Sequence, residues 1–164
     1  MILSIDPGTE KCGISILSKK IKIEIEYSKQ LPLIGSSLEQ RLWYLFEFLD
    51  QLISSYKNSI ECIALEQTFV APMDNGKAKY NIQSPLKLSM ARGIVWSLAG
   101  KYGLKVYEYH PRDVKFASTR NYNASKKMIM REISKHWKAG VNEDEADSIS
   151  VGLAHYLAES QKSK

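Results

Sequence analysis

The stretch MILSIDPG, residues 1–8, is a short apolar run that ends at Asp6 and is followed by a proline and a glycine. This pattern is typical of a β-strand that enters a tight turn. A second apolar run, Gly13–Leu17, predicts a second strand. In Ile21–Tyr27 apolar and charged residues alternate, which predicts a third strand with one face exposed to water.

Helix and strand patterns alternate in the rest of the chain. Ser36 and Glu39 form a capping-box signature, and apolar residues at helical spacing follow as far as Tyr56. Ile60–Leu65 is a nearly continuous apolar run, as expected of a central strand covered on both faces. The further expected elements are a helix at Pro85–Tyr102, a strand at Leu104–Tyr109, and helices at Ala124–Trp137 and Glu143–Glu159.

This order of elements predicts an α/β fold in which a five-stranded mixed β-sheet is flanked by α-helices. The first three strands would form a meander, and right-handed crossover connections would add the later strands. The sequence contains no internal repeat and no linker. One domain is therefore expected over residues 1–164.

The composition favours a soluble protein with a polyanionic partner. No apolar run approaches the roughly 20 residues needed to cross a bilayer, so no membrane partner is expected. Cys12 and Cys62 show neither metal-site spacing nor a disulfide framework, so the expected location is cytoplasmic. The 23 Lys and Arg residues exceed the 18 Asp and Glu residues. This excess of positive charge suits nucleic acid, because each neutralised phosphate releases counterions.

Four carboxylates lie where the predicted elements end or begin. Asp6 closes the first strand and Glu66 closes the central strand, while Asp144 and Asp147 are three apart on the last helix and share one face. If the first and fourth strands are parallel neighbours, Asp6 and Glu66 project from the same edge of the sheet. A helix packed across that edge would complete a four-carboxylate site for Mg²⁺, and two such ions can promote an in-line phosphodiester displacement.

Each acid also has a purely structural interpretation. An aspartate before Pro-Gly is common turn chemistry. Asp144 lies in a first helical turn behind a predicted Asn142 cap, where acids complement the helix dipole. Glu66 is harder to explain in this way, because an acid at the end of a buried strand needs a partner.

Five short motifs resemble the RuvC family of Holliday-junction resolvases, in the family's order and near its spacing. They extend over most of the chain, from about residue 2 to about residue 157. The motifs are Ile5-Asp6-Pro7-Gly8-Thr9, Leu65-Glu66-Gln67-Thr68-Phe69, Ala91-Arg92-Gly93, Tyr109-His110-Pro111-Arg112-Asp113-Val114-Lys115 and Asp144-Glu145-Ala146-Asp147-Ser148.

The resemblance implies a ribonuclease-H-like fold and an endonuclease that places paired symmetrical nicks in four-way junction DNA. It implies a homodimer that depends on Mg²⁺, for which Mn²⁺ is expected to substitute, and a branch-migration motor is a candidate partner. The implied catalytic and metal-binding residues are Asp6, Glu66, Asp144 and Asp147. The implied DNA-binding residues are Phe69, which matches an aromatic inserted near the junction centre, together with Lys115, Lys126, Lys127 and Arg131.

One helix is expected in the dimer interface. In Pro85–Tyr102 the small residues Ala91, Gly93 and Ala99 would permit a second helix to approach closely. Paired cuts also require two active sites related by a two-fold axis.

Two segments depart from the family pattern. Arg120–Asn123 stands where a glycine-containing turn is usual, and Pro72–Ser84 is somewhat longer than usual. Both lie where DNA contacts are expected, so they bear on substrate preference and not on the chemistry.

Three other kinds of protein share part of this pattern. An ATP-binding domain of the actin and sugar-kinase class also opens with a strand and an Asp-x-Gly-Thr phosphate turn, but that class needs two domains around a nucleotide cleft. A related nuclease acting on RNA or other branched DNA would share the acidic site. A non-catalytic junction-binding protein would not keep four repelling carboxylates beside phosphates.

Overall fold

A computed structural model describes residues 1–56, 59–67 and 83–162. At its centre is a five-stranded sheet with the order β3-β2-β1-β4-β5. β1, β4 and β5 are parallel to one another, whereas β2 is antiparallel to β1 and β3. The predicted five-stranded mixed sheet is thus confirmed. The strands are β1 (Ile2–Asp6), β2 (Lys11–Lys19), β3 (Ile23–Pro32), β4 (Cys62–Glu66) and β5 (Lys105–Tyr109).

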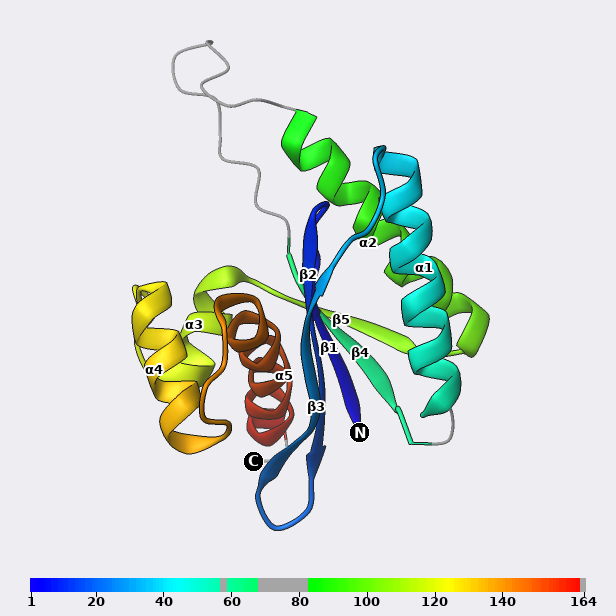
Figure 1. The fold of residues 1–164 in the computed structure, drawn as a ribbon. Helices are drawn as coiled ribbons and strands as arrows, with labels where there is room; N and C mark the ends of the chain where they lie inside the picture. Colours follow the sequence, from blue (N-terminus) through cyan, green and yellow to red (C-terminus); the bar gives the residue numbers. More distant parts are fainter. Residues whose placement is uncertain (57–58, 68–82, 163–164) are drawn as a thin grey trace, which may run out of the picture.

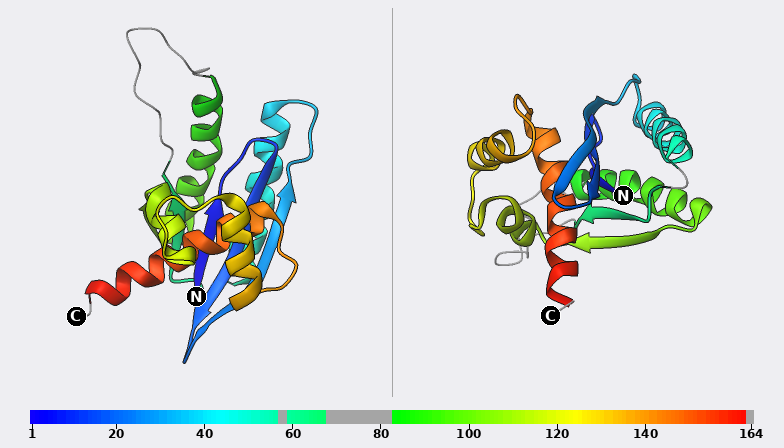
Figure 2. Two further views of the ribbon diagram at one scale, coloured as in Figure 1. Left: turned by 90° about the vertical axis from the view of Figure 1, so that its left-hand side faces the viewer. Right: turned by 90° about the horizontal axis from the view of Figure 1, so that it is seen from below.

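Helices cover both faces of the sheet (Figure 1). α1 (Leu38–Ser55) and α2 (Gln83–Tyr102) lie on one face. The other face carries α3 (Pro111–Thr119), α4 (Lys126–His136) and α5 (Glu143–Lys162), and α5 runs across the strands (Figure 2). None of these helices, in the part of the chain that is described, is long and apolar enough to cross a membrane.

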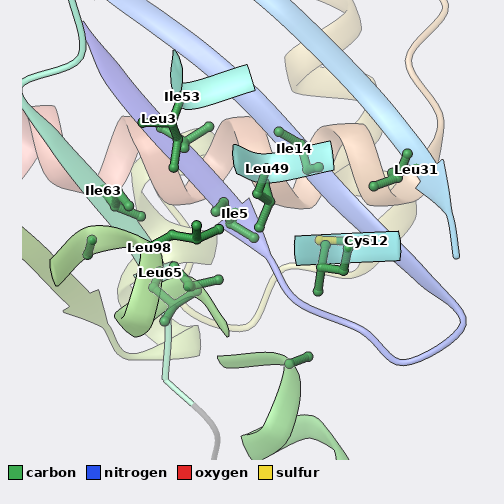
Figure 3. Close-up of a cluster of buried hydrophobic side chains, with 14 of the residues drawn as sticks. Leu3, Ile5, Cys12, Ile14, Leu31, Leu49, Ile53, Ile63, Leu65 and Leu98 are labelled. Carbon is green, nitrogen blue, oxygen red and sulfur yellow. The ribbon is translucent and has the colours of Figure 1, made fainter. Parts of the chain in front are cut away.

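Each helical layer buries its own apolar cluster against the sheet. The first cluster joins β-strand residues such as Leu3, Ile14 and Ile63 to Leu49 of α1 and Leu98 of α2 (Figure 3). The second lies under α3, α4 and α5. Because both faces of the central strands are covered, their inner residues are apolar or small, and the charged side chains come at their ends.

α3 is an element that the sequence patterns did not predict. It begins after His110, whose Nδ1 accepts a hydrogen bond from the Arg112 backbone N–H at 3.2 Å. Pro111 follows in the first turn, where a missing N–H breaks no helical hydrogen bond. The helix has only nine residues, which is too short for a clear apolar period.

Two local predictions were wrong: the N-cap of the first helix by one residue, and the third strand at both ends, since it continues to Pro32 and not to Tyr27. The N-cap of α1 is Ser37 and not Ser36, because the Ser37 hydroxyl accepts from the Gln40 N–H, while the Gln40 side chain accepts from the Ser36 N–H at 2.9 Å. The third strand starts at Ile23, and Ile21 is fully exposed at the hairpin tip. The pairing of β2 with β3 shifts by one residue between Ile16 and Leu17. Side chains of β3 before and after this shift therefore do not keep one regular alternation between the two faces of the sheet.

Candidate active site

The carboxyl ends of β1 and β4 bring two acids to one edge of the sheet. The two strands are parallel and Ile5 pairs with Leu65, so the residues that follow, Asp6 and Glu66, end their strands side by side. The adjacency on which the predicted site depended is confirmed. Only a helix across this edge is needed to bring the remaining acids to it.

α5 packs across this edge because a glycine in β2 lets it approach. A Cβ at Gly13 would lie 2.1 Å from the carbonyl oxygen of Asp144, so any larger residue would push the helix away. The hydroxyls of Ser15 and Ser148, 2.6 Å apart, tie β2 to the next turn of the helix. The first turns of α5 are thereby held against the sheet beside Asp6.

The start of α5 fixes which acids face the site. The Asn142 Oδ1 accepts from the Glu145 N–H at 3.0 Å, which confirms the predicted cap. Glu145 faces another way, because it accepts hydrogen bonds from the Ser28 hydroxyl and the Lys138 ammonium. Glu145 therefore has different neighbours from Asp144 and Asp147, although it lies between them in the sequence.

The four acids are close enough for their charges to raise the pKa values of Asp6, Glu66 and Asp147. Burial, and then the negative charges of Glu66, Asp147 and Asp144, raises the pKa of Asp6 to about 8, although Lys126 opposes this rise. Burial, and then Asp147, raises the pKa of Glu66 to about 7, although Lys115, Lys126 and Arg92 oppose this rise. The pKa of Asp147 is also raised, first by burial. Such a cluster favours any added positive charge.

Asp144 is held by groups from the sheet. The Lys11 ammonium lies 2.7 Å from the Asp144 Oδ2, and the Gln30 side-chain amide donates to the same oxygen. Lys11 begins β2 and Gln30 lies opposite Gly13 on β3. The carboxylate is thus oriented by two neighbouring strands.

Two further cations border the acids. Lys126, the first residue of α4, donates to Glu143 and lies 3.6 Å from the Asp147 Oδ2. Arg92 of α2 donates to the Glu66 carbonyl oxygen and to the Glu108 carboxylate. Arg92 thereby joins the ends of β4 and β5 and fixes the backbone that carries Glu66.

The acids have the donor chemistry of a divalent-cation site. Within the described ranges, no three or more His, Cys, Asp or Glu side chains are grouped so that they could hold a metal ion. Asp144 and Asp147 instead contact Lys11 and Lys126. Carboxylate oxygens are the ligands that Mg²⁺ prefers, and a bound cation would counter the burial and mutual repulsion that raise the pKa values of Asp6 and Glu66. The chemistry of these donor atoms, though not their present grouping, therefore suits a divalent ion, which would replace the ammonium groups of Lys11 and Lys126 as their partner.

The predicted DNA-binding residues divide into three groups. Lys115 and Lys126 lie near the acids, since both act on the pKa of Glu66. Lys127 is exposed on α4, and Arg131 is exposed and paired with Glu132 at 3.0 Å; no contact joins either of them to the four acids. Phe69, at the end of the second motif, lies outside the described residues.

The unusual turn before α4 is built from aromatic and basic side chains. Arg120 ends α3 with φ 59°, a left-handed conformation that more often belongs to glycine. Phe116 and Tyr122 stack with ring centroids 4.4 Å apart, and the Arg112 guanidinium lies over Tyr122. Lys126 still reaches Asp147 beyond this turn, so the bulky residues do not displace it. Pro72–Ser84, the other departure, lies almost entirely outside the described residues.

Three site residues were missed by the sequence analysis. Gln30 lies beyond the predicted end of the third strand, and Lys11 lies in what was expected to be a turn. Arg92 belongs to one of the five motifs, but the sequence alone suggests no role for it. An extension of the alternating pattern through Gln30 is the one signal that could have found any of them.

Comparison with known proteins places this geometry in a family. The family model described as "Crossover junction endodeoxyribonuclease RuvC" matches residues 2–155. A protein of that name from Citrifermentans bemidjiense is 32% identical over 163 residues, covering 94% of this chain and 91% of the relative. A namesake from an Anaeromyxobacter species is 29% identical over 157 residues, covering 94% of this chain and 80% of the relative.

Solved structures show the same fold. The structure titled "T. thermophilus RuvC in complex with Holliday junction substrate" matches with a TM-score of 0.82 at 19% identity, covering 98% of this chain and 95% of that chain. A fowlpox virus resolvase solved with junction DNA matches with a TM-score of 0.59 at 15% identity, covering 96% of this chain and 99% of that chain. The expected ribonuclease-H-like fold is confirmed.

Proposed function

Because the chain belongs to the crossover junction endodeoxyribonuclease RuvC family, we propose that it is an endonuclease that resolves four-way DNA junctions by paired, symmetrical nicks. The observation that carries the proposal is the gathering of Asp6, Glu66, Asp144 and Asp147 from β1, β4 and α5 at one sheet edge. An ATP-binding domain of the actin and sugar-kinase class would not need such an acidic site at the edge of a single sheet, so this geometry argues against that class.

The four acids are proposed to hold the catalytic divalent ions. The ions expected are Mg²⁺ or, in its place, Mn²⁺, and they would supply charge stabilisation and an activated water for phosphodiester hydrolysis. Asp6 and Glu66 offer rigid ligands, because each ends a buried strand. Asp144 and Asp147 come from a helix whose distance to the sheet is fixed by Gly13.

The basic side chains have separate proposed tasks. Lys126 lies beside the acids, so its ammonium can neutralise charge that develops on the scissile phosphate. The charge of Lys115, which lies on α3, lowers the pKa of Glu66. This lysine is proposed to bind a neighbouring phosphate. Lys127 and Arg131 extend the basic surface along α4, and Phe69 is proposed to stack on a base near the junction centre.

The exposed face of α2 is the proposed homodimer interface. Leu86 and Met90 are more than half exposed, at 57% and 52%, and Gly93 and Trp96 follow on the same side of the helix. Of the small residues expected there, Ala91 and Ala99 are instead buried in the core of the chain at 0% and 2% exposure. Gly93 faces open space, so a partner helix can approach it closely.

A cleavage assay tests this function directly. A mobile four-way junction in Mg²⁺ should be nicked symmetrically, and linear duplex, a flap and an RNA–DNA hybrid should be cut far more slowly. Preferential cutting of the flap or of the hybrid would instead favour a related nuclease of the same superfamily. Tight junction binding without cleavage in Mg²⁺ or Mn²⁺ would favour a binding protein. The cytoplasmic location and the branch-migration motor remain predictions.

A further inference from the structure

A hollow of about 610 Å³ opens between the tip of the β2–β3 hairpin, the end of α3 and the second halves of α4 and α5. Its size falls within the range of about 300–1,000 Å³ typical of binding pockets. The hairpin tip and the turn after Asp6 lie at opposite ends of the sheet (Figure 1). Tyr156 in the wall follows Asp147 by more than two helical turns, roughly 13 Å along the axis. The hollow is therefore separate from the candidate active site.

The interior of the hollow is apolar and preformed. Ile23, Leu153 and Leu157 line it together with the rings of Trp137 and Tyr156. The Tyr156 hydroxyl donates to the Leu17 carbonyl oxygen at 3.2 Å, which fixes that ring as a wall. A large apolar or aromatic side chain would meet apolar walls here, one of which, the Tyr156 ring, is already held in place.

The rim of the hollow carries positive charge without local compensation. Among the described residues, no carboxylate lies within 4 Å of the cationic groups of Lys19, Lys22 or Arg120. Glu132, the acidic side chain of the lining, is paired with Arg131 at 3.0 Å and lies 3.5 Å from His136. The rim thus attracts a negatively charged ligand, whereas Lys11 and Lys126 in the active site already contact acids.

The hairpin tip adds an apolar group beside the same cations. Ile21 lies between Lys20 and Lys22 and is fully exposed. A single exposed isoleucine is ordinary on a protein surface, but a partner bound at this tip would cover it. The tip thus places one apolar side chain next to Lys22, which lines the hollow.

We propose that this hollow is a docking site for an acidic peptide segment of a partner protein. A leucine or aromatic side chain of the segment would enter the apolar hollow, and its carboxylates would meet Lys19, Lys22 and Arg120. Duplex DNA matches the charge but not the shape, since its phosphates would reach only the rim and leave the apolar interior unfilled. The site would recruit the enzyme through a surface that the cleavage reaction does not use.

A labelled peptide tests the proposal. We would use fluorescein-labelled Asp-Asp-Glu-Asp-Leu-Phe and, as a matched probe, the same peptide ending in Ser-Gly. Fluorescence anisotropy with the full chain should give a Kd in the micromolar range for the first peptide and one weaker by about tenfold or more for the second. The double variant Lys19→Glu/Lys22→Glu should weaken binding of the first peptide by about tenfold or more, whereas Lys105→Glu, an exposed lysine of β5, should not.

Junction cleavage separates this site from the proposed function. Both lysine variants should cut a four-way junction at close to the wild-type rate, because neither touches the acids. The proposal is overturned if the first peptide does not bind, if the double variant binds it as well as wild-type does, or if both peptides bind equally. Weaker junction binding by the double variant, with junction DNA displacing the peptide, would assign the surface to DNA instead.

Discussion

At the scale of single residues, the four carboxylates make the sharpest prediction. Asp6→Asn, Glu66→Gln, Asp144→Asn and Asp147→Asn should each lower Mg²⁺-dependent nicking by about a thousandfold or more, because an amide cannot replace an anionic oxygen ligand. Junction binding, measured by anisotropy in EDTA, should survive. Asp113→Asn, in an exposed position of α3, is the matched control and should cut normally. Unimpaired cleavage by any two of the four variants would contradict the site.

The raised pKa of Asp6 predicts how stability depends on pH in the absence of metal. Its pKa is raised from 3.8 to about 8, first by burial, so the folded state binds this proton more tightly than the unfolded chain does. Stability contributed by the protonated carboxyl is therefore lost as the pH rises through about 8. In EDTA the melting temperature of the wild type should fall from pH 7 to pH 9, by about 2–4 °C for each kcal/mol lost.

Asp6→Asn provides the control for that experiment, because an amide does not titrate. Its melting temperature should change less over the same pH range. Excess Mg²⁺ should stabilise the wild type more at pH 9 than at pH 7, since ligand binding then competes with fewer protons. Equal pH dependence of wild type and variant would show that Asp6 is not buried among the other acids.

Lys126 and Lys115 should differ in kinetics. If Lys126 stabilises charge in the transition state, Lys126→Ala should stay slow at saturating protein, by roughly 10²-fold in single-turnover cleavage. Lys115→Ala should weaken binding, reduce the salt slope by about one unit and recover its rate at saturation. Lys127→Ala, the exposed neighbour on α4, is the control for lost charge. A wild-type rate for Lys126→Ala would reduce that lysine to a phosphate contact.

At the scale of elements, the packing of α5 on β2 determines where half of the acids lie. A methyl group at Gly13 would contact the Asp144 backbone at 2.1 Å, so Gly13→Ala must displace α5 or distort β2. We expect a loss of about 1–3 kcal/mol in the free energy of unfolding. We also expect a larger loss of cleavage than this instability explains, because Asp144 and Asp147 move together.

Urea unfolding and cleavage at 20 °C below the variant's own melting temperature would separate the two effects. Ser148→Ala removes the neighbouring contact to Ser15 but adds no atoms, so it should lower stability without moving the helix. A Gly13→Ala protein that is fully active would show that the helix tolerates the methyl group. The close contact between α5 and β2 would then not be required for cleavage.

At the scale of the whole molecule, two copies are expected to be joined through α2. Leu86→Glu/Met90→Glu should convert a dimer to a monomer in light scattering at micromolar concentration, since charge in an apolar interface is costly. The monomer should lose paired cutting of the junction while its fold, measured by circular dichroism, stays intact. Ile34→Glu changes an apolar residue before α1 that is at least as exposed, at 63%, and should leave the dimer unchanged.

The sequence by itself determined the order of the strands and of every helix except α3, the mixed sheet and the four candidate acids. Those features depend on local patterns: apolar runs stopped by Asp-Pro-Gly, helical spacing, and a cap at Asn142. Each pattern is encoded within a few residues, so it can be recognised without knowledge of the fold. The family resemblance added roles for the acids, but their adjacency still required β1 and β4 to be parallel neighbours.

Only the tertiary structure decided which residues serve those acids and which surfaces remain free. Lys11, Gln30 and Arg92 reach the site through partners far away in sequence, and no local period marks such contacts. The same holds for α2, where Ala91 is buried and Gly93 is exposed although both are small. The burial of a residue and the charges around it depend on several elements that come together only when the chain folds. The hollow at the far end of α5 has the same origin, because four elements must meet to form it.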